Sequence, residues 1–260
     1  MLVVGTGIRF GAHLTQEASA CIARADKTLY VVADPATRAF LQERARDAES
    51  LERFYDPARK RTSAYESMVD RTLSFVRAGK HVCLALYGHP GIFASVGHES
   101  ISRARAEGHY ARMLPAVSTE DCLFADLGLD PARRGCQTFE ATDFVLRRRV
   151  ADSTCALILY QVTAVGEYRL PVEVNRGGLR VLTELLLEQY PGSHEVVVYL
   201  AAVYAVTEPV ILKLRLDELG EATIPPMATL YVPPLCRRRI DPVMRERLRA
   251  ATGVPVPMSS

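Results

Sequence analysis

The chain has 260 residues, and its 48% hydrophobic and 24% charged residues are typical of a globular protein rather than a disordered one. Its 32 basic and 30 acidic residues leave a net charge of +2, which argues against a dedicated nucleic-acid partner. The longest apolar run, residues 196–206, has 11 residues where a membrane helix needs about 20, so we expect no membrane partner either.

Residues 1–114 alternate short apolar runs with helical patterns, which predicts a first α/β domain with a doubly wound parallel sheet. Strands are expected at 2–4, 28–32, 81–86 and 111–114, and helices at 15–24, 35–46, 62–78 and 95–107. Thr15 and Asp34 are residue types that begin helices, and Gly79 is one that ends them.

Residues 115–118 mark a predicted boundary, after which the strands become β-branched and lie closer together. Strands are expected at 137–140, 156–162, 195–205, 209–214 and 228–232, and helices at 119–126 and 178–189. One long helix among several strands favours a mixed sheet in a second α/β domain, residues 115–234.

The last segment, residues 235–260, is a basic tail. Its six arginines and two acidic residues give a charge of +4, which leaves −2 for the rest of the chain. Such a segment is either a solvated surface helix or a docking segment for a partner chain or an acidic peptide.

The six cysteines are scattered along the chain. None belongs to the close pairs that hold a metal or form a redox motif, so we expect no metal site. Reduced thiols in this pattern indicate a cytoplasmic protein.

Two glycine-containing turns follow predicted strands. Gly5 and Gly7 come after the first strand, where glycines let the backbone approach a ligand, although a tight strand-to-helix turn explains them equally well. The sequence Tyr-Gly-His-Pro-Gly begins at Tyr87 after another strand, at the edge where open α/β sheets bind ligands. His89 is there either a ligand contact or a turn residue bonded to the backbone.

A third candidate combines two tyrosines with an arginine. Arg61 and Tyr65 are four residues apart and share one face of a predicted helix, and Tyr55 precedes that helix in a proline-containing loop. A guanidinium lowers the pKa of a nearby phenol and stabilises developing negative charge, so this cluster can deprotonate a weak acid. The alternative is an arginine stacked between tyrosines on a surface helix.

These turns, together with Pro115-x-x-Ser118, resemble the tetrapyrrole (precorrin/uroporphyrin) methylase superfamily over about Leu2 to Pro234. The resemblance implies two α/β domains with a cleft between them that holds S-adenosylmethionine. Longer blocks, above all Ser118-x-Glu120-Asp121-Cys122-Leu123-Phe124-Ala125-Asp126-Leu127-Gly128, resemble the borosin methyltransferases. Borosin enzymes methylate backbone amide nitrogens of a ribosomal peptide.

Carried over residue by residue, the resemblance implies that Tyr55, Arg61 and Tyr65 are catalytic. A further family tyrosine, three positions before Tyr55, is Glu52 here, which is a departure from the family pattern. The expected cofactor-binding residues are Gly5, Gly7, Tyr87, His89, Ile92, Ser118, Gln161, Ala201, Ala228 and Thr229.

The resemblance also suggests how these residues act. Tyr65 is expected to be the base, Arg61 to lower its pKa, and Tyr55 with Arg61 to bond the peptide carbonyl oxygen as charge develops. No metal is needed in this scheme. A tetrapyrrole C-methyltransferase and a non-catalytic cofactor-binding scaffold are the alternative functions.

The resemblance implies a homodimer and a peptide substrate. In the family the substrate is either fused to the enzyme or a separate chain. Residues 254–260 are rich in proline, which has no N–H to methylate, so we expect a separate precursor peptide (the split layout).

Overall fold

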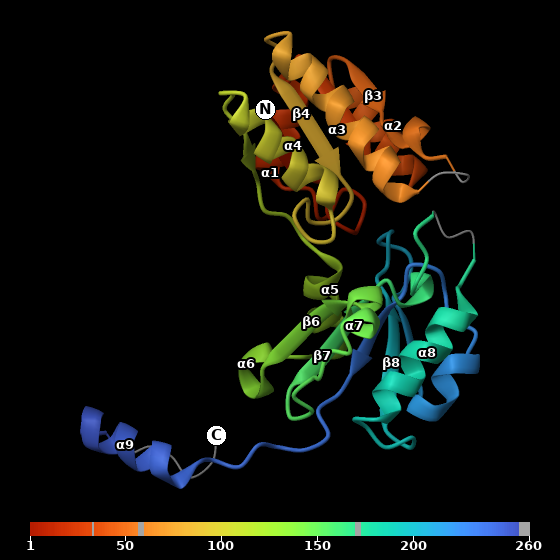
Figure 1. The fold of residues 1–260 in the computed structure, drawn as a ribbon. Helices are drawn as coiled ribbons and strands as arrows, with labels where there is room; N and C mark the ends of the chain where they lie inside the picture. Colours follow the sequence, from red (N-terminus) through yellow and green to blue (C-terminus); the bar gives the residue numbers. More distant parts are fainter. Residues whose placement is uncertain (33, 57–59, 170–172, 255–260) are drawn as a thin grey trace.

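The computed structural model describes residues 1–32, 34–56, 60–169 and 173–254. It contains two five-stranded sheets, one above the other in Figure 1, each with its own helices. The expected α/β architecture with two sheets is therefore confirmed, and residues 115–118 connect the sheets. The domain limits stay a prediction.

The first sheet is entirely parallel, with strand order β3-β2-β4-β1-β5. Its strands are β1 (Leu2–Gly5), β2 (Lys27–Val31), β3 (Ala48–Ser50), β4 (Val82–Leu86) and β5 (Arg112–Met113). Its helices are α1 (Gln16–Arg24), α2 (Pro35–Arg44), α3 (Arg61–Arg77) and α4 (Ser95–Ala106), with a short 3₁₀ turn, η1 (Glu52–Phe54), after β3.

Both faces of this sheet are buried because successive strand residues point to opposite sides. Val3 and Leu29 pack under α3 and α4, whereas Val4 and Tyr30 pack under α1 and α2. The result is the doubly wound arrangement, in which ligands bind beyond the carboxyl ends of the strands.

The second sheet is mixed, with strand order β6-β7-β10-β8-β9. Its strands are β6 (Cys136–Glu140), β7 (Ala156–Tyr160), β8 (Glu195–Leu200), β9 (Val210–Arg215) and β10 (Thr229–Val232). Only β6 and β7 are parallel neighbours, and the other three pairs are antiparallel. Its helical elements are α5 (Thr119–Leu127), α6 (Pro131–Arg134), α7 (Ala141–Leu146), α8 (Arg176–Leu187), η2 (Val162–Ala164) and η3 (Leu216–Glu221).

One face of the second sheet packs against α7, α8 and η3, and the other against α5. Acidic residues of α5 bond the sheet and cap the helix itself. Asp126 accepts a hydrogen bond from the Tyr199 hydroxyl at 2.6 Å, and Asp121 completes a capping box with Ser118 at the start of the helix. The block that resembles borosin enzymes thus forms α5, the helix that packs against this face of the second sheet.

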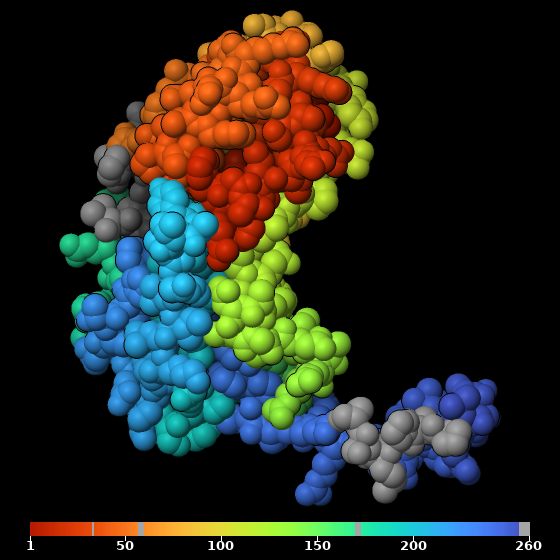
Figure 2. Space-filling model, turned by 180° about the vertical axis from the view of Figure 1, so that it is seen from behind, coloured from red at the N-terminus to blue at the C-terminus, as the bar shows by residue number. Residues whose placement is uncertain are grey.

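The chain after β8 leaves the sheet earlier than the sequence predicts. The expected strand extends to residue 205, but β8 ends at Leu200, and the following light-blue segment lies against the red N-terminal part in Figure 2. There the Phe10 N–H donates to the Val203 carbonyl at 2.8 Å. The sequence stays hydrophobic after Leu200 because Ala201 and Ala202 are buried at this junction, and not because the strand continues.

The described part of the basic tail contains the helix α9 (Pro242–Thr252), which extends away from the rest of the molecule in Figure 1. None of its residues is buried. Residues 255–260, which the split-layout expectation uses, lie outside the described part of the chain.

Candidate active site

A cavity of about 550 Å³ lies between the two sheets. It opens at the carboxyl ends of β2, β4 and β7, because Val32, Tyr87 and Gln161 directly follow these strands and all line it. This is the position at which open α/β sheets bind ligands, and the volume is typical of a small-molecule site.

The structure brings nine of the predicted site residues to this cavity. They are Tyr55, Arg61, Tyr65, Tyr87, His89, Ile92, Ser118, Gln161 and Thr229. The catalytic candidates come from neighbouring elements: Tyr55 follows η1, and Arg61 and Tyr65 lie on the first turns of α3. The rings of Tyr55 and Tyr65 meet edge to face, with centroids 6.3 Å apart. Residues 57–59, between Tyr55 and Arg61, lie outside the described part.

Arg61 is bound to the opposite side of the cavity. Its Nη2 donates to the Glu167 carbonyl at 2.7 Å and its Nη1 to Gln161 Oε1 at 3.4 Å. Its backbone N–H donates to the Tyr168 carbonyl at 2.9 Å. The guanidinium is therefore fixed by the part of the chain that carries the second sheet, although α3 belongs to the first.

Tyr55 is suited to donate a hydrogen bond rather than to accept a proton. Burial raises the pKa of its phenol, the nearby Tyr65 and Glu52 raise this pKa further, and Arg61 opposes them. Because the pKa lies above its ordinary value, Tyr55 remains a neutral donor at neutral pH.

Tyr87 and His89, two of the predicted cofactor residues, line the cavity together with the cluster. Burial raises the pKa of Tyr87 to about 12, with Cys122 and Asp34 adding to the shift, so this phenol is also neutral. His89 Nδ1 accepts a hydrogen bond from the Gly91 N–H at 3.0 Å, which leaves the proton of the neutral ring on Nε2. His89 is thus bonded to the backbone, as one sequence interpretation expects, and it also lines the cavity, while its role as a ligand contact stays a prediction.

Three non-glycine residues on the cavity wall have positive φ angles. They are Phe93 (52°), Gln161 (57°) and Met227 (65°). Each such conformation costs on the order of 1 kcal/mol and persists where the surroundings impose it, often at functional sites. Gln161 uses this backbone bend to turn its amide toward Arg61.

Gly5, Gly7, Ala201 and Ala228 do not line the cavity. Gly5 and Gly7 allow two loops to meet: the N–H and carbonyl of Gly7 bond those of Gly88, and a Cβ on Gly5 would lie 2.2 Å from the Gly88 carbonyl oxygen. Their tight packing shapes the wall next to Tyr87. Ala201 and Ala228 are buried in the protein interior.

Sequence reasoning missed the part of the wall formed by Tyr160. Its hydroxyl donates to Glu120 Oε2 at 2.6 Å, and its ring lies 4.4 Å from that of Phe93, between centroids. The signal that could have found Tyr160 is its place in the predicted strand 156–162, directly before the predicted site residue Gln161.

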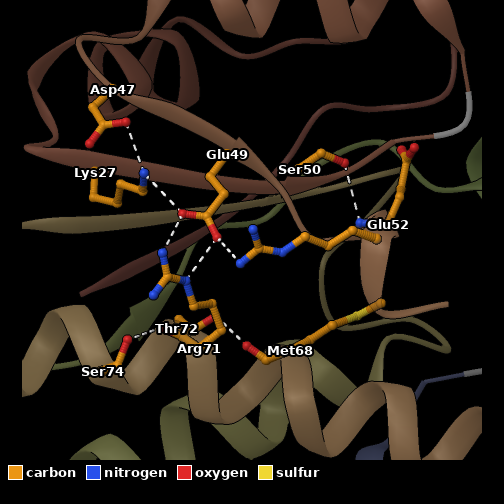
Figure 3. Close-up of polar contacts among 10 residues, drawn as sticks. Lys27, Asp47, Glu49, Ser50, Glu52, Met68, Arg71, Thr72 and Ser74 are labelled. Carbon is orange, nitrogen blue, oxygen red and sulfur yellow. Dashed lines mark hydrogen bonds and ion pairs between the residues drawn. The ribbon is translucent and has the colours of Figure 1, made fainter.

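A charged network supports the loop that carries Tyr55. Glu49 of β3 accepts from Lys27 at 3.0 Å, from Arg53 of η1 at 2.7 Å and from Arg71 of α3 at 2.8 Å, and Figure 3 shows Glu49 between Lys27 and Arg71. Hydrogen bonds from Arg71, then from Lys27, outweigh burial and lower the pKa of Glu49 to about 2. One carboxylate thus connects η1, before Tyr55, to the helix of Tyr65.

Among the described residues, no group of three or more His, Cys, Asp or Glu side chains is placed to hold a metal ion. In the same part of the chain, every helix is too short or too polar to cross a membrane.

Two sheets flanked by helices, with a cavity at the ends of their strands, are the architecture of the tetrapyrrole methylases. Comparison of the sequence with known families points to the same family. The family model for Tetrapyrrole (Corrin/Porphyrin) Methylases matches residues 1–219, so the chain belongs to this family.

Curated relatives confirm the resemblance to borosin enzymes. The chain is 39% identical to a methyltransferase/ribosomally synthesized cyclic peptide dendrothelin A precursor from Dendrothele bispora, over 93% of this chain and 59% of the relative. It is 38% identical to the corresponding omphalotin A precursor from Omphalotus olearius, over 98% of this chain and 63% of the relative. A type I borosin cyclic peptide precursor from Coprinopsis marcescibilis is 39% identical, over 96% and 66%. The chain therefore spans about six tenths of the length of these relatives.

Solved structures share the fold. A uroporphyrin-III-C-methyltransferase from Thermus thermophilus has a TM-score of 0.64 at 21% identity, covering 90% of this chain and 91% of that one. A cobalt precorrin-4 methyltransferase has a TM-score of 0.62 at 16% identity, covering 89% and 94%. At these identities the likeness concerns the fold alone.

Proposed function

We propose that this protein is an S-adenosylmethionine-dependent methyltransferase that methylates backbone amide nitrogens of a ribosomal peptide, as in borosin biosynthesis. The observation that carries the proposal is the Tyr55–Arg61–Tyr65 cluster at one end of a cavity of cofactor size. The names of the relatives favour a peptide over a tetrapyrrole as the substrate.

The residues present fit the cofactor. Beside the cluster, the cavity lining combines an aromatic hydroxyl, a histidine N–H and the Ser118 hydroxyl with apolar surface, which suits an adenosine and an amino acid. Tyr87, His89, Ile92, Ser118, Gln161 and Thr229 would hold it. When bound, S-adenosylmethionine supplies an electrophilic methyl group on a sulfonium.

The catalytic cluster would activate a poor nucleophile. An amide nitrogen shares its lone pair with the carbonyl, so the nitrogen must lose its proton and the oxygen must be stabilised as negative charge develops. We assign Tyr65 as the base that removes the proton. Tyr55, kept neutral by its raised pKa, donates to the carbonyl oxygen, and the Arg61 guanidinium stabilises the charge.

We further propose that the substrate is a separate precursor peptide, that the enzyme is a homodimer, and that it acts in the cytoplasm. Mixing the purified chain with synthetic peptides tests whether a substrate can be supplied as a separate molecule. Analytical ultracentrifugation at micromolar concentration tests the dimer, and a monomer there would contradict it.

The central experiment measures methyl transfer and cofactor binding separately. Tyr65→Phe and Arg61→Ala should lose methylation of peptides rich in Val, Ile and Gly, detected by fragment masses that place each added methyl group on the backbone. Both variants should still bind S-adenosylhomocysteine in calorimetry. Lys60→Ala, which removes an exposed cation beside Arg61, is the matched control. Near-normal turnover in either catalytic variant, or methylation of a porphyrinogen instead, would contradict the assignment.

A further inference from the structure

Glu52 places a carboxylate on the cavity wall at the catalytic end. It lies in η1, three residues before Tyr55, and its side chain is 26% exposed. The resembling family has a tyrosine here, so this wall carries a carboxylate, paired with Arg38, where the family pattern has a phenol. An acceptor of this kind beside the proposed reacting groups bears on what they accept as substrate.

The carboxylate is held rigidly. Oε2 accepts from Arg38 Nη2 at 2.6 Å, and Oε1 accepts from the Val32 N–H at 3.3 Å. The backbone around it is fixed as well, since the Glu52 N–H donates to the Ser50 hydroxyl, visible in Figure 3, and the Tyr55 N–H donates to the Glu52 carbonyl at 2.9 Å. Glu52 and Tyr55 therefore keep a fixed mutual position.

Glu52 still has acceptor capacity toward the cavity. A carboxylate offers about four lone-pair sites, and the contacts from Arg38 and Val32 use two of them. A group that only accepts hydrogen bonds recognises donors. An extended peptide with apolar side chains presents one kind of donor here, its backbone N–H groups.

We propose that Glu52 is a specificity-determining residue that accepts a hydrogen bond from a substrate backbone N–H flanking the amide methylated at the Tyr55–Arg61–Tyr65 cluster. This inference rests on the proposed function. An N-methylated or proline residue at the flanking position has no N–H and would leave the carboxylate without its donor. The enzyme would therefore discriminate against peptides already methylated at that one position.

The expected discrimination is about tenfold, because leaving a partly buried acceptor without its partner costs enough to change affinity by about that factor. The test uses a synthetic peptide of Val, Ile and Gly and a set of its derivatives, each with a single N-methyl group. For the wild type, kcat/KM should fall about tenfold or more at one flanking position. In Glu52→Gln, whose amide oxygen still accepts, the factor should shrink, and in Glu52→Ala it should vanish.

Controls separate the possible failures. Glu43 is an exposed carboxylate on α2, and Glu43→Gln should keep the wild-type dependence of kcat/KM on the position of the N-methyl group. Both Glu52 variants should bind S-adenosylhomocysteine normally if they are folded. An unchanged N-methyl profile in Glu52→Ala would overturn the inference and leave the proposed function standing. Loss of S-adenosylhomocysteine affinity in Glu52→Gln at unchanged melting temperature would assign the carboxylate to the cofactor and also overturn it. Absence of methylation of every probe by the wild type would contradict the proposed function itself.

Discussion

Replacing Glu49 by glutamine tests the network that supports the Tyr55 loop. Glutamine has nearly the same shape but no charge, so Lys27, Arg53 and Arg71 would lose their shared anion. Lys27 is only 7% exposed and would keep Asp47 as its partner, at 2.8 Å. We expect the variant to fold and to be markedly less stable.

The magnitude follows from the pKa of Glu49, which is about 2 in the fold and 4.5 by its ordinary value. One pKa unit corresponds to about 1.4 kcal/mol, so the charged form contributes about 3 kcal/mol of stability at neutral pH. Because the pKa is lowered by folding, this contribution is complete above pH 4.5 and is lost as the pH falls toward 2. The variant lacks the titrating group, so its deficit should shrink by about 1 kcal/mol between pH 7 and pH 4.

Urea denaturation followed by circular dichroism measures both quantities, with Glu43→Gln as the control. A deficit below about 0.5 kcal/mol, the range of ordinary surface substitutions, would refute the claim that the network stabilises the fold. A deficit that is equal at pH 7 and pH 4 would refute its electrostatic origin.

Three further outcomes are expected. Gly7 and Gly11 share a φ of 71°, but a Cβ on Gly7 would lie 2.2 Å from the His13 Cβ and one on Gly11 would meet nothing. Gly11→Ala should therefore cost about 1 kcal/mol in urea denaturation and Gly7→Ala clearly more, and equal costs would contradict the clash. Tyr160→Phe should lower stability by about 1–3 kcal/mol, because Glu120 loses its donor; an unchanged urea midpoint would contradict this. In an ultraviolet titration, Tyr87→Phe should remove a phenolate component near pH 12, whereas loss of one near pH 10 would show an ordinary phenol.

Much of the fold was predictable because strand runs and helix caps are local signals. Asp34 caps α2 with a 2.8 Å hydrogen bond to the Thr37 N–H, as its place before Pro35 suggests. The early end of β8 was not predictable, since a buried junction and a buried strand have the same apolar composition. The strand β3 has only three residues, and its central side chain, Glu49, is charged and faces Lys27 and Arg71, so a period-based search for apolar runs does not detect it.

The grouping of the candidate site residues was predictable where they lie close in sequence and not where the fold brings distant ones together. The spacing of Arg61 and Tyr65 on one helix indicates a shared face. Nothing in the sequence indicates that Arg61 bonds Glu167, more than a hundred residues later, or that Glu120 meets Tyr160. The first contact depends on how the two sheets face each other and the second on how α5 packs against its sheet, and local patterns encode neither.

The attachment of Arg61 to the far wall couples the opening of the cavity to the position of its guanidinium. Under the proposed function, any motion that widens the cavity to admit a peptide or release a product must break the bonds of Arg61 to Gln161, Glu167 and Tyr168, or move them with it. If they break, an open molecule has its guanidinium displaced from the two tyrosines and would not activate an amide. Closure and assembly of the proposed catalytic cluster would then be one event, and a bound cofactor alone would not make the open form competent.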